Sequence, residues 1–325
     1  MTAMPSTDAE ALQALLQKTS RTFALTIPML PQPLRTEIGV AYLLFRIIDT
    51  FEDATAWPPA ERLAALTDFV RLLEDDATDA AARAAADAWL RRPPVAHDGY
   101  NELLRDVPRV LGWYRRLAAP ARAQMRRHVA RSAEGMGRFV DRTDANGVLR
   151  LETMEDLHAY CYAVAGIVGE MLTELFVLGD AHLGGVASEL RSRAVAFGEG
   201  LQLVNILKDA GADAVEGRTY LPRQVSLAEV FTVARADLRQ ATEYIETLRT
   251  AGADRGLVAF NALNASLAIA TLRLLRDKGL GAKLTRPQVA GLAAHVAHAL
   301  DTGLPLFDFQ GLGPARPATP DSDHA

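Results

Sequence analysis

The sequence predicts an all-α protein, a single-domain helical bundle around a central cavity. Three observations support this fold class. Apolar residues recur with the period of about 3.6 that is typical of amphipathic helices, from Ala9 to Leu300. No run of alternating β-branched residues is bounded by turn dipeptides. Residues 39–53 are apolar on every face but one, which indicates a core helix beside a cavity.

Composition and charge limit the classes of function. A chain of 325 residues is long enough to bury a sizeable core. Its residues are 49% hydrophobic but only 6% aromatic, as in a mainly helical protein. The net charge of -5 and the lack of a basic segment with interspersed aromatics argue against a nucleic-acid partner. Asp8 and Glu10, without a basic run, do not resemble a signal peptide.

Proline, glycine and polar clusters divide the helical pattern into segments. We expect a helical domain over residues 1–310 and a disordered tail over 311–325, because the tail is rich in Pro, Ala and Asp. The expected breaks between helices fall at residues 28–33, 57–59, 92–99, 141–147 and 219–222.

The apolar helix within residues 39–53 carries one polar stripe. Tyr42, Arg46, Asp49 and Asp53 follow one another at steps of four, three and four residues and so share a face. Because the other faces are apolar, we expect this stripe to line an internal cavity. The carboxylates, with Glu52 beside them, are hard oxygen ligands suited to Mg²⁺. The guanidinium of Arg46 is suited to hold a phosphate.

A second stripe of the same kind lies near residue 200. Gln202, Asn205, Asp209 and Asp213 follow at steps of three, four and four among apolar neighbours. A single acidic pair at this spacing is common on solvated helix faces, so the second copy decides the interpretation. Two acidic stripes on apolar helices suit a site that ionises a diphosphate, because metal ions on both walls neutralise the leaving pyrophosphate.

Cysteine content and hydropathy bear on the compartment. The one cysteine, Cys161, excludes an intrachain disulfide, fits a reducing compartment and is expected to be buried and inert. Residues 159–179 are long and apolar enough to span a bilayer, but they contain Glu170 and Glu174, whose charges are costly at mid-membrane depth. We therefore expect a buried core helix and a cytoplasmic protein.

Four sequence blocks resemble the squalene and phytoene synthase family. The first is SRTFALTIPMLPQPLRTEIGVAYLLFRIIDTFEDA at residues 20–54. MGRFV follows at 136–140, YCYAVAGIVGEML at 160–172 and NILKDAGADAVEGRTYLP at 205–222. The blocks stand in the family's order and approximate spacing, and two acidic motifs with the intervening blocks make a specific signal.

The resemblance implies an isoprenoid-synthase-type fold and a head-to-head prenyltransferase. In this family Mg²⁺ draws pyrophosphate from one allylic prenyl diphosphate, and a second molecule attacks the cation. The first block is closest to squalene synthases, which implies farnesyl diphosphate as substrate, presqualene diphosphate as intermediate and squalene as product. NADPH ends that reaction, but Arg273 and Arg276 stand where small or aromatic residues are expected, so NADPH use stays open.

By match to the family motifs, the residues divide into groups. The metal ligands would be Asp49, Glu52, Asp53, Asn205, Asp209 and Asp213, with Gln202 orienting the second cluster. The groups that take phosphate oxygens would be Ser20, Arg21, Arg46, Lys208 and Arg218. Tyr160 corresponds to the tyrosine implicated in proton handling and cation stabilisation. The lining of the tail pocket would be Phe23, Tyr42, Val164, Ala165, Val168 and Leu172.

Other interpretations remain for these residues and for the whole chain. The apolar members of the tail pocket could be plain core, Tyr42 and Tyr160 could be satisfied buried tyrosines, and Ser20 and Arg21 could cap a helix. The enzyme alternatives are a phytoene synthase using geranylgeranyl diphosphate, a dehydrosqualene synthase, and a class I terpene cyclase. The non-enzyme alternative is a helical protein that binds prenyl diphosphates. A peripheral membrane contact for product release also stays open.

Overall fold

The computed structural model describes residues 4–144, 148–215 and 218–307, without the side chains of 212–215 and 218. The predicted tail, 311–325, lies outside the described residues. The helices in the first half are α1 Ser6–Thr19, α2 Phe23–Thr26, the 3₁₀ turn η1 Ile27–Met29, α3 Leu34–Glu52, α4 Pro59–Arg71, α5 Asp79–Leu90, α6 Asp98–Arg105, α7 Val107–Arg116 and α8 Ala119–Val140.

The second half is also helical, apart from one short strand pairing. Strands β1 Leu149–Arg150 and β2 Arg218–Thr219 pair in parallel. The helices are α9 Met154–Cys161, the π-helix η2 Tyr162–Gly166, α10 Ile167–Gly179, the 3₁₀ helix η3 Ala181–Val186, α11 Ala187–Val215, α12 Leu227–Thr250, α13 Arg255–Lys278 and α14 Arg286–Thr302. The all-α prediction is confirmed, and helices are interrupted at each of the predicted breaks.

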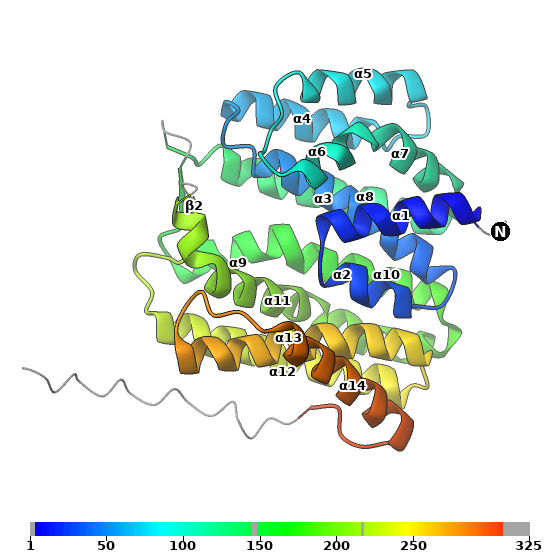
Figure 1. Cartoon of the computed structure of the whole chain (residues 1–325), viewed down its shortest axis with the longest axis vertical. Coiled ribbons are helices and arrows are strands. Elements are labelled where there is room, and N and C mark those ends of the chain that lie inside the picture. Colours follow the sequence, from blue (N-terminus) through cyan, green and yellow to red (C-terminus); the bar gives the residue numbers. More distant parts are fainter. Residues whose placement is uncertain (1–3, 145–147, 216–217, 308–325) are drawn as a thin grey trace, which may run out of the picture.

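The helices form a bundle whose long central members enclose the site. Figure 1 shows α4 to α7 stacked over α3 and α8 at one end, with α12, α13 and α14 at the other. Helix α11 packs against α10, α12 and α13, and α3 packs against α1, α4, α8 and α10. The pocket described below is lined mainly by side chains of α3, α10, α11 and α13.

Helix α3 confirms the unusual pattern that the sequence shows. From Glu37 to its end, its side chains are buried apart from those of Tyr42, Arg46 and Asp49, which are half-buried. Asp53, which caps the helix, is also half-buried. The polar stripe is therefore the side of α3 that other helices leave uncovered.

Helices α10 and α11 approach each other closely beneath the pocket. A Cβ atom on Gly198 would lie 2.1 Å from the carbonyl oxygen of Ala165, and one on Gly169 would lie 2.1 Å from that of Ala194. The π-helix η2 ends just before this crossing, and the Oγ of Ser132 on α8 donates a hydrogen bond of 2.6 Å to the carbonyl oxygen of Ala163 within it. This contact satisfies a carbonyl where the α-helical ladder is interrupted.

The apolar segment at 159–179 is divided among α9, η2 and α10 and does not form one uniform helix. Cys161 within it is buried, as predicted. Met154–Gly179 and Arg255–Lys278 are both long and apolar enough to cross a membrane. Most of the second segment and somewhat less than half of the first are covered inside the protein, as also happens in core helices of soluble proteins.

Candidate active site

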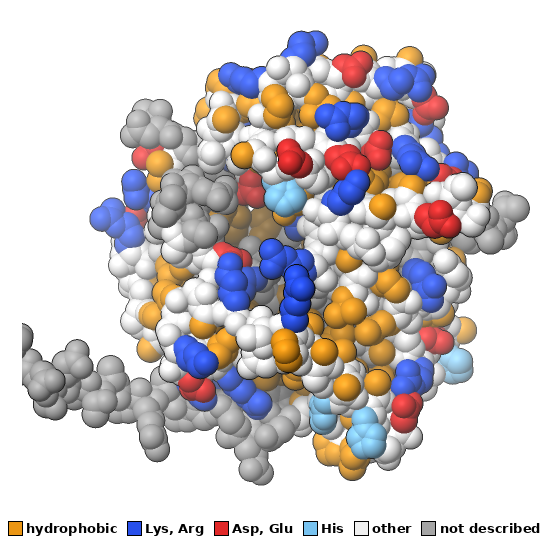
Figure 2. Space-filling model, viewed as in Figure 1, with side chains coloured by type: hydrophobic (Ala, Val, Ile, Leu, Met, Phe, Trp, Pro, Cys, Tyr) orange, Lys and Arg blue, Asp and Glu red, His pale blue; other side chains and the backbone are white. Residues whose placement is uncertain are grey.

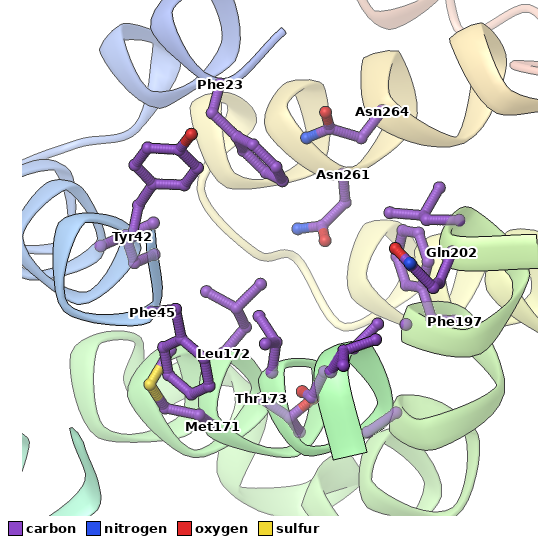
Figure 3. Close-up of a pocket in the computed structure, with 18 of the residues that line it drawn as sticks. Phe23, Tyr42, Phe45, Met171, Leu172, Thr173, Phe197, Gln202, Asn261 and Asn264 are labelled. Carbon is purple, nitrogen blue, oxygen red and sulfur yellow. The ribbon is translucent and has the colours of Figure 1, made fainter. Parts of the chain in front are cut away.

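One pocket is lined by the first residues of both predicted stripes, Tyr42, Arg46 and Asp49 on one side and Gln202 and Asn205 on the other. Figure 2 shows a hollow near the centre of one face of the molecule, with Lys and Arg side chains gathered along its edge. The pocket is lined from α2, α3, η2, α10, α11, α12 and α13, and Figure 3 shows side chains from facing helices converging on it. The predicted residues in its lining are Phe23, Tyr42, Arg46, Asp49, Val164, Ala165, Val168, Leu172, Gln202 and Asn205.

A chain of contacts fixes Arg46 on the α3 wall. The hydroxyl of Tyr42 donates a hydrogen bond of 2.9 Å to the carbonyl oxygen of Thr19, and the Nε of Arg46 donates one of 3.3 Å to the Tyr42 hydroxyl. The Nη1 of Arg46 lies 3.4 Å from the Oδ2 of Asp49. Its guanidinium also lies 5.2 Å from the ring centre of Tyr100, a cation–π distance. Arg46 is therefore held in place before any ligand binds.

The half-buried carboxyl group of Asp49 lies close to that of Asp53, which caps α3. Burial and the neighbouring charge of Asp53 raise the pKa of Asp49 to about 6, although Arg46 acts in the opposite direction. A divalent cation would favour the ionised carboxylate. Carboxylate oxygens are also the ligands that Mg²⁺ prefers, so the donor set fits that ion.

Three of the predicted metal ligands, Asp53, Asp209 and Glu52, are not among the residues that line the pocket. Glu52 is buried. Its backbone carbonyl accepts a hydrogen bond from the buried side chain of Arg62. Among the side chains that the structure describes, no group of three or more His, Cys, Asp or Glu residues is arranged to hold a metal ion.

The α11 wall is more open and carries lysines. The Nζ of Lys208 donates a hydrogen bond of 2.8 Å to the Oδ1 of Asn205 and lies 3.2 Å from the Oδ2 of Asp209. The Nζ of Lys283, from the connection between α13 and α14, lies 3.5 Å from the Oδ1 of Asp209. Sequence reasoning missed Lys283, because no local pattern connects it with the second stripe.

Two predicted residues of this region have side chains outside the described part. Asp213 lies in α11 and Arg218 in β2, and only their backbone is described. The phosphate role predicted for Arg218 and the metal role predicted for Asp213 therefore stay predictions.

Ser20, just before α2, makes the helix-capping interaction that was the alternative to its predicted phosphate-binding role. The Oγ of Ser20 accepts a hydrogen bond of 3.0 Å from the backbone N–H of Phe23. Arg21 is exposed, and neither residue is part of the pocket lining. The ring of Phe23 does line the pocket, 5.2 Å from the ring of Tyr42 and 6.4 Å from that of Phe260.

Tyr160 is not part of the pocket lining and lies near the acidic end of α3. Its ring stacks on that of Tyr220 at 4.6 Å and meets Phe139 edge-on at 5.2 Å. Burial, together with the nearby charges of Glu52 and Asp53, raises its pKa well above the ordinary tyrosine value. Tyr160 therefore keeps its proton at neutral pH. The role in proton handling that the resemblance implies for Tyr160 stays a prediction, and its stacking on Tyr220 was not predicted from the sequence.

Further polar residues were not predicted from the sequence. Asn261, Asn264, Thr173 and Tyr244 line the pocket beside large apolar side chains. They lie on helices whose overall pattern is that of core segments, and only the three-residue spacing of the two asparagines on α13 could have suggested that they share a face.

An all-α bundle with a pocket between two acidic helices defines a protein of the isoprenoid synthase type. The model of the squalene/phytoene synthase family matches residues 16–230, so this chain belongs to that family. It is 29% identical over 213 residues to squalene synthase of Schizosaccharomyces pombe, covering 65% of this chain and 43% of the relative. It is 32% identical over 229 residues to squalene synthase of Cyberlindnera jadinii, covering 68% and 48%. The chain thus spans less than half the length of these relatives.

Solved structures show the same fold over nearly the whole chain. A structure of TcSQS with a bound ligand has a TM-score of 0.74 at 27% identity, covering 91% of this chain and 86% of that one. A dehydrosqualene synthase in complex with a ligand has a TM-score of 0.54 at 19% identity, covering 91% and 97%, which shows a likeness of fold alone. The predicted isoprenoid-synthase-type fold is therefore confirmed.

Proposed function

We propose that this chain is a Mg²⁺-dependent prenyltransferase that condenses two farnesyl diphosphates head to head, through presqualene diphosphate, to squalene. The observation that carries the proposal is one pocket that combines an apolar lining with Arg46 and Asp49 on α3 and Gln202 and Asn205 on α11. Such a pocket suits a ligand with a charged head and a long hydrocarbon chain. The relatives named squalene synthase support the choice of reaction.

Carboxylate and amide oxygens on the two walls would hold the metal. Asp49 and Asp53 would do so on α3, and Asp209 with Asn205 on α11, joined by Asp213 and Glu52 as the family motifs imply. Bound Mg²⁺ would neutralise charge that develops on the leaving pyrophosphate. The raised pKa of Asp49 supports this assignment, because burial and Asp53 disfavour its ionised form without a cation.

Cations at the edge of the pocket would take phosphate oxygens. Arg46 is already fixed by Tyr42 and Tyr100, which lowers the conformational cost of binding. Lys208 and Lys283 currently contact Asp209 and would turn to the diphosphate when metal takes the carboxylate. Ser20, Arg21 and Arg218 belong to this group on the family motif alone.

The rest of the pocket would hold the chains and exclude water. Phe23, Val164 and Leu172 offer apolar surface, and the ring faces of Phe23 and Tyr42 offer negative potential to a passing carbocation. Tyr160, whose raised pKa strengthens its hold on the proton, would keep a proton on its hydroxyl near Asp53. Water that entered would compete for the cation, so the apolar lining protects the reaction.

Incubation of the purified protein with farnesyl diphosphate and Mg²⁺, with and without NADPH, tests the proposal by product mass. Squalene formed only with NADPH supports it fully. Dehydrosqualene formed regardless of NADPH keeps the head-to-head coupling and overturns the reductive step. Product from geranylgeranyl diphosphate alone would assign a phytoene synthase instead.

Two further outcomes would overturn the proposal. A cyclic or linear product with the carbon number of one substrate would assign a class I terpene cyclase. Tight binding of farnesyl diphosphate without pyrophosphate release would assign a protein that binds prenyl diphosphates. Omission of Mg²⁺ is the control, and it should abolish pyrophosphate release.

We also propose that the protein works in the cytoplasm and touches a membrane peripherally to release its hydrocarbon product. The apolarity of squalene supports this, because a bilayer is the favoured phase for it. Sedimentation with lipid vesicles during turnover tests the contact. Equal recovery in the supernatant with and without vesicles would contradict it.

A further inference from the structure

The wall of the pocket formed by α13 carries two buried carboxamides. Asn261 and Asn264 are 3% and 6% exposed, yet both line the pocket, and Figure 3 shows them directed into it from α13. Their neighbours in the lining include Phe176 and Phe260, whose side chains are fully apolar. A prenyl chain is a hydrocarbon and offers these carboxamides no hydrogen bond. Their position in the lining therefore suggests that a polar group binds beside the chain.

The side-chain nitrogens of both asparagines donate hydrogen bonds to the protein, whereas their side-chain oxygens accept none that the structure describes. The Nδ2 of Asn261 donates to the carbonyl oxygen of Leu257 at 2.9 Å. The Nδ2 of Asn264 donates to the carbonyl oxygen of Phe260 at 2.9 Å and to the Oγ1 of Thr26 at 3.4 Å. Within the described part of the chain, neither Oδ1 accepts a hydrogen bond. Both oxygens face the open pocket, and a hydrocarbon that covered them would leave an acceptor without a donor, at a cost of about 1–3 kcal/mol each.

A third acceptor lies on the same lining. The Oγ1 of Thr173 donates its hydrogen to the carbonyl oxygen of Gly169 at 2.9 Å. The hydroxyl of Tyr244, 2.9 Å from Thr173 Oγ1, must then be the donor in their contact. The lone pairs of Tyr244 remain available, and both residues line the pocket. The polar groups of the lining are thus rich in acceptors, and their natural complement is a hydroxyl donor.

We propose that Asn261 and Asn264 form a subsite that binds a hydroxyl group, supplied by an oxygenated prenyl chain or by a water molecule retained beside an unoxygenated one. The proposal rests on the proposed function, because it takes the pocket to be the site of prenyl diphosphates. A hydroxyl would satisfy acceptors that a hydrocarbon leaves unpaired. A water molecule would do the same, provided that it finds several polar partners in the cavity.

Calorimetric binding in the presence of Mg²⁺ tests the subsite. The plain probe is farnesyl S-thiolodiphosphate, an analogue that resists ionisation, and the hydroxylated probes carry one hydroxyl on each chain methyl group in turn. Each is titrated into the wild type and into the double variant Asn261→Leu with Asn264→Leu, which keeps side-chain size and removes the acceptors. The matched control is Gln240→Leu, which removes a carboxamide from α12 outside the pocket lining.

The two sources of the hydroxyl give different results. If the chain supplies it, the wild type prefers one hydroxylated probe, and the double variant shifts this preference by about 10-fold toward the plain probe. If water supplies it, the wild type binds both probes alike, and the double variant gains several-fold affinity for the plain probe alone. In both cases the Gln240→Leu control should keep the wild-type ratio of affinities for the hydroxylated and plain probes.

If the double variant binds the plain and the hydroxylated probes with the same affinities as the wild type, the subsite is overturned while the proposed function stays intact. Failure of the wild type to bind the plain probe would overturn the proposed function and the subsite with it. If the double variant does not fold, by its helical spectrum, the single variants Asn261→Leu and Asn264→Leu take its place. Asn261→Leu keeps the contact between Asn264 and Thr26, so it leaves the link between α2 and α13 intact.

Discussion

The two walls of the pocket carry similar polar stripes in very different surroundings. On α3, Arg46 is bound by Tyr42, Tyr100 and Asp49, and the rest of the helix is buried. On α11, Asn205 is exposed, and Asp209 lies between two lysine ammonium groups. The same spacing of residues therefore gives a preformed wall where other helices pack around it, and an adjustable wall where lysines from a loop and the helix itself supply the partners.

The largest expected effect concerns the preformed wall. Asp49→Asn should lower kcat about 10²–10³-fold, because one oriented charge at the site of developing pyrophosphate charge is lost. Pyrophosphate release from farnesyl diphosphate measures this. Asp68→Asn, an exposed carboxylate on α4 that pairs with Arg71, is the control and should keep the wild-type rate.

The close packing of α10 against α11 beneath the pocket can be tested separately from the polar walls. Gly198→Ala should cost about 2–4 kcal/mol of unfolding free energy, because the added methyl group would overlap the carbonyl oxygen of Ala165. Gly291→Ala in α14, where nothing lies near the added group, should instead stabilise the protein by about 0.5–1 kcal/mol. Urea denaturation of both variants checks this, and equal costs would contradict the close approach of α10 and α11.

The rear of α11 contributes a dependence of stability on pH. Burial and the charge of Glu199 raise the pKa of Asp237, on α12, from 3.8 to about 7, although His158 acts in the opposite direction. Because the folded protein holds this proton more tightly than the unfolded chain, stability is greatest below about pH 4 for this group and falls as pH rises to about 7. The full shift corresponds to about 4 kcal/mol, at about 1.4 kcal/mol for each pKa unit, and because Asp237 is partly exposed, solvent screening makes the loss smaller than that.

Asp237→Asn should remove most of this slope. We expect the stability advantage of the variant over the wild type to be larger at pH 8 than at pH 5, as measured by urea denaturation at both values. If stability changes between pH 5 and pH 8 in the same way in the wild type and in the variant, Asp237 is not the source of the pH dependence. Glu199, whose pKa burial also raises, would account for any slope that remains.

The smallest expected effects compare the contacts of the two walls directly. Tyr42→Phe removes the hydrogen bond to Thr19 and one contact of Arg46, and should cost about 1 kcal/mol of unfolding free energy. Lys283→Ala removes an ion pair in which the lysine side chain is 65% exposed. This change should alter the free energy of unfolding by less than about 0.5 kcal/mol. Thermal unfolding at two salt concentrations measures both, and a larger cost for Lys283→Ala would reverse the contrast between the walls.

Local pattern was enough to predict the parts of the site that lie along one helix. The stripe on α3 is visible because a step of three or four residues repeats within one helix that is otherwise apolar. Lys283, Tyr100 and Tyr220 could not be found in this way, since they reach the site from segments distant in sequence. The π-helix at 162–166 depends on packing against α8 and has no periodic signature.

Buried polar residues in the pocket were missed for a related reason. Asn261 and Asn264 lie in a helix that is almost entirely core, and an asparagine in such a helix gives no indication of which neighbour it faces. Glu52, predicted as a ligand from its place beside Asp53 in sequence, is buried and does not line the pocket, and its metal role stays a prediction. Sequence spacing identifies a face of a helix, and only packing identifies what covers it.

The most direct test of the central claim is a double-mutant cycle across the pocket. The kcat for Mg²⁺-dependent pyrophosphate release is measured for Asp49→Asn, Asp209→Asn and the two combined. If both walls hold one metal–diphosphate assembly, each single change should lose most of the activity, and the double variant should be about as slow as the slower single variant. Wild-type turnover in either single variant, or losses that simply multiply in the double variant, would contradict a site shared by α3 and α11.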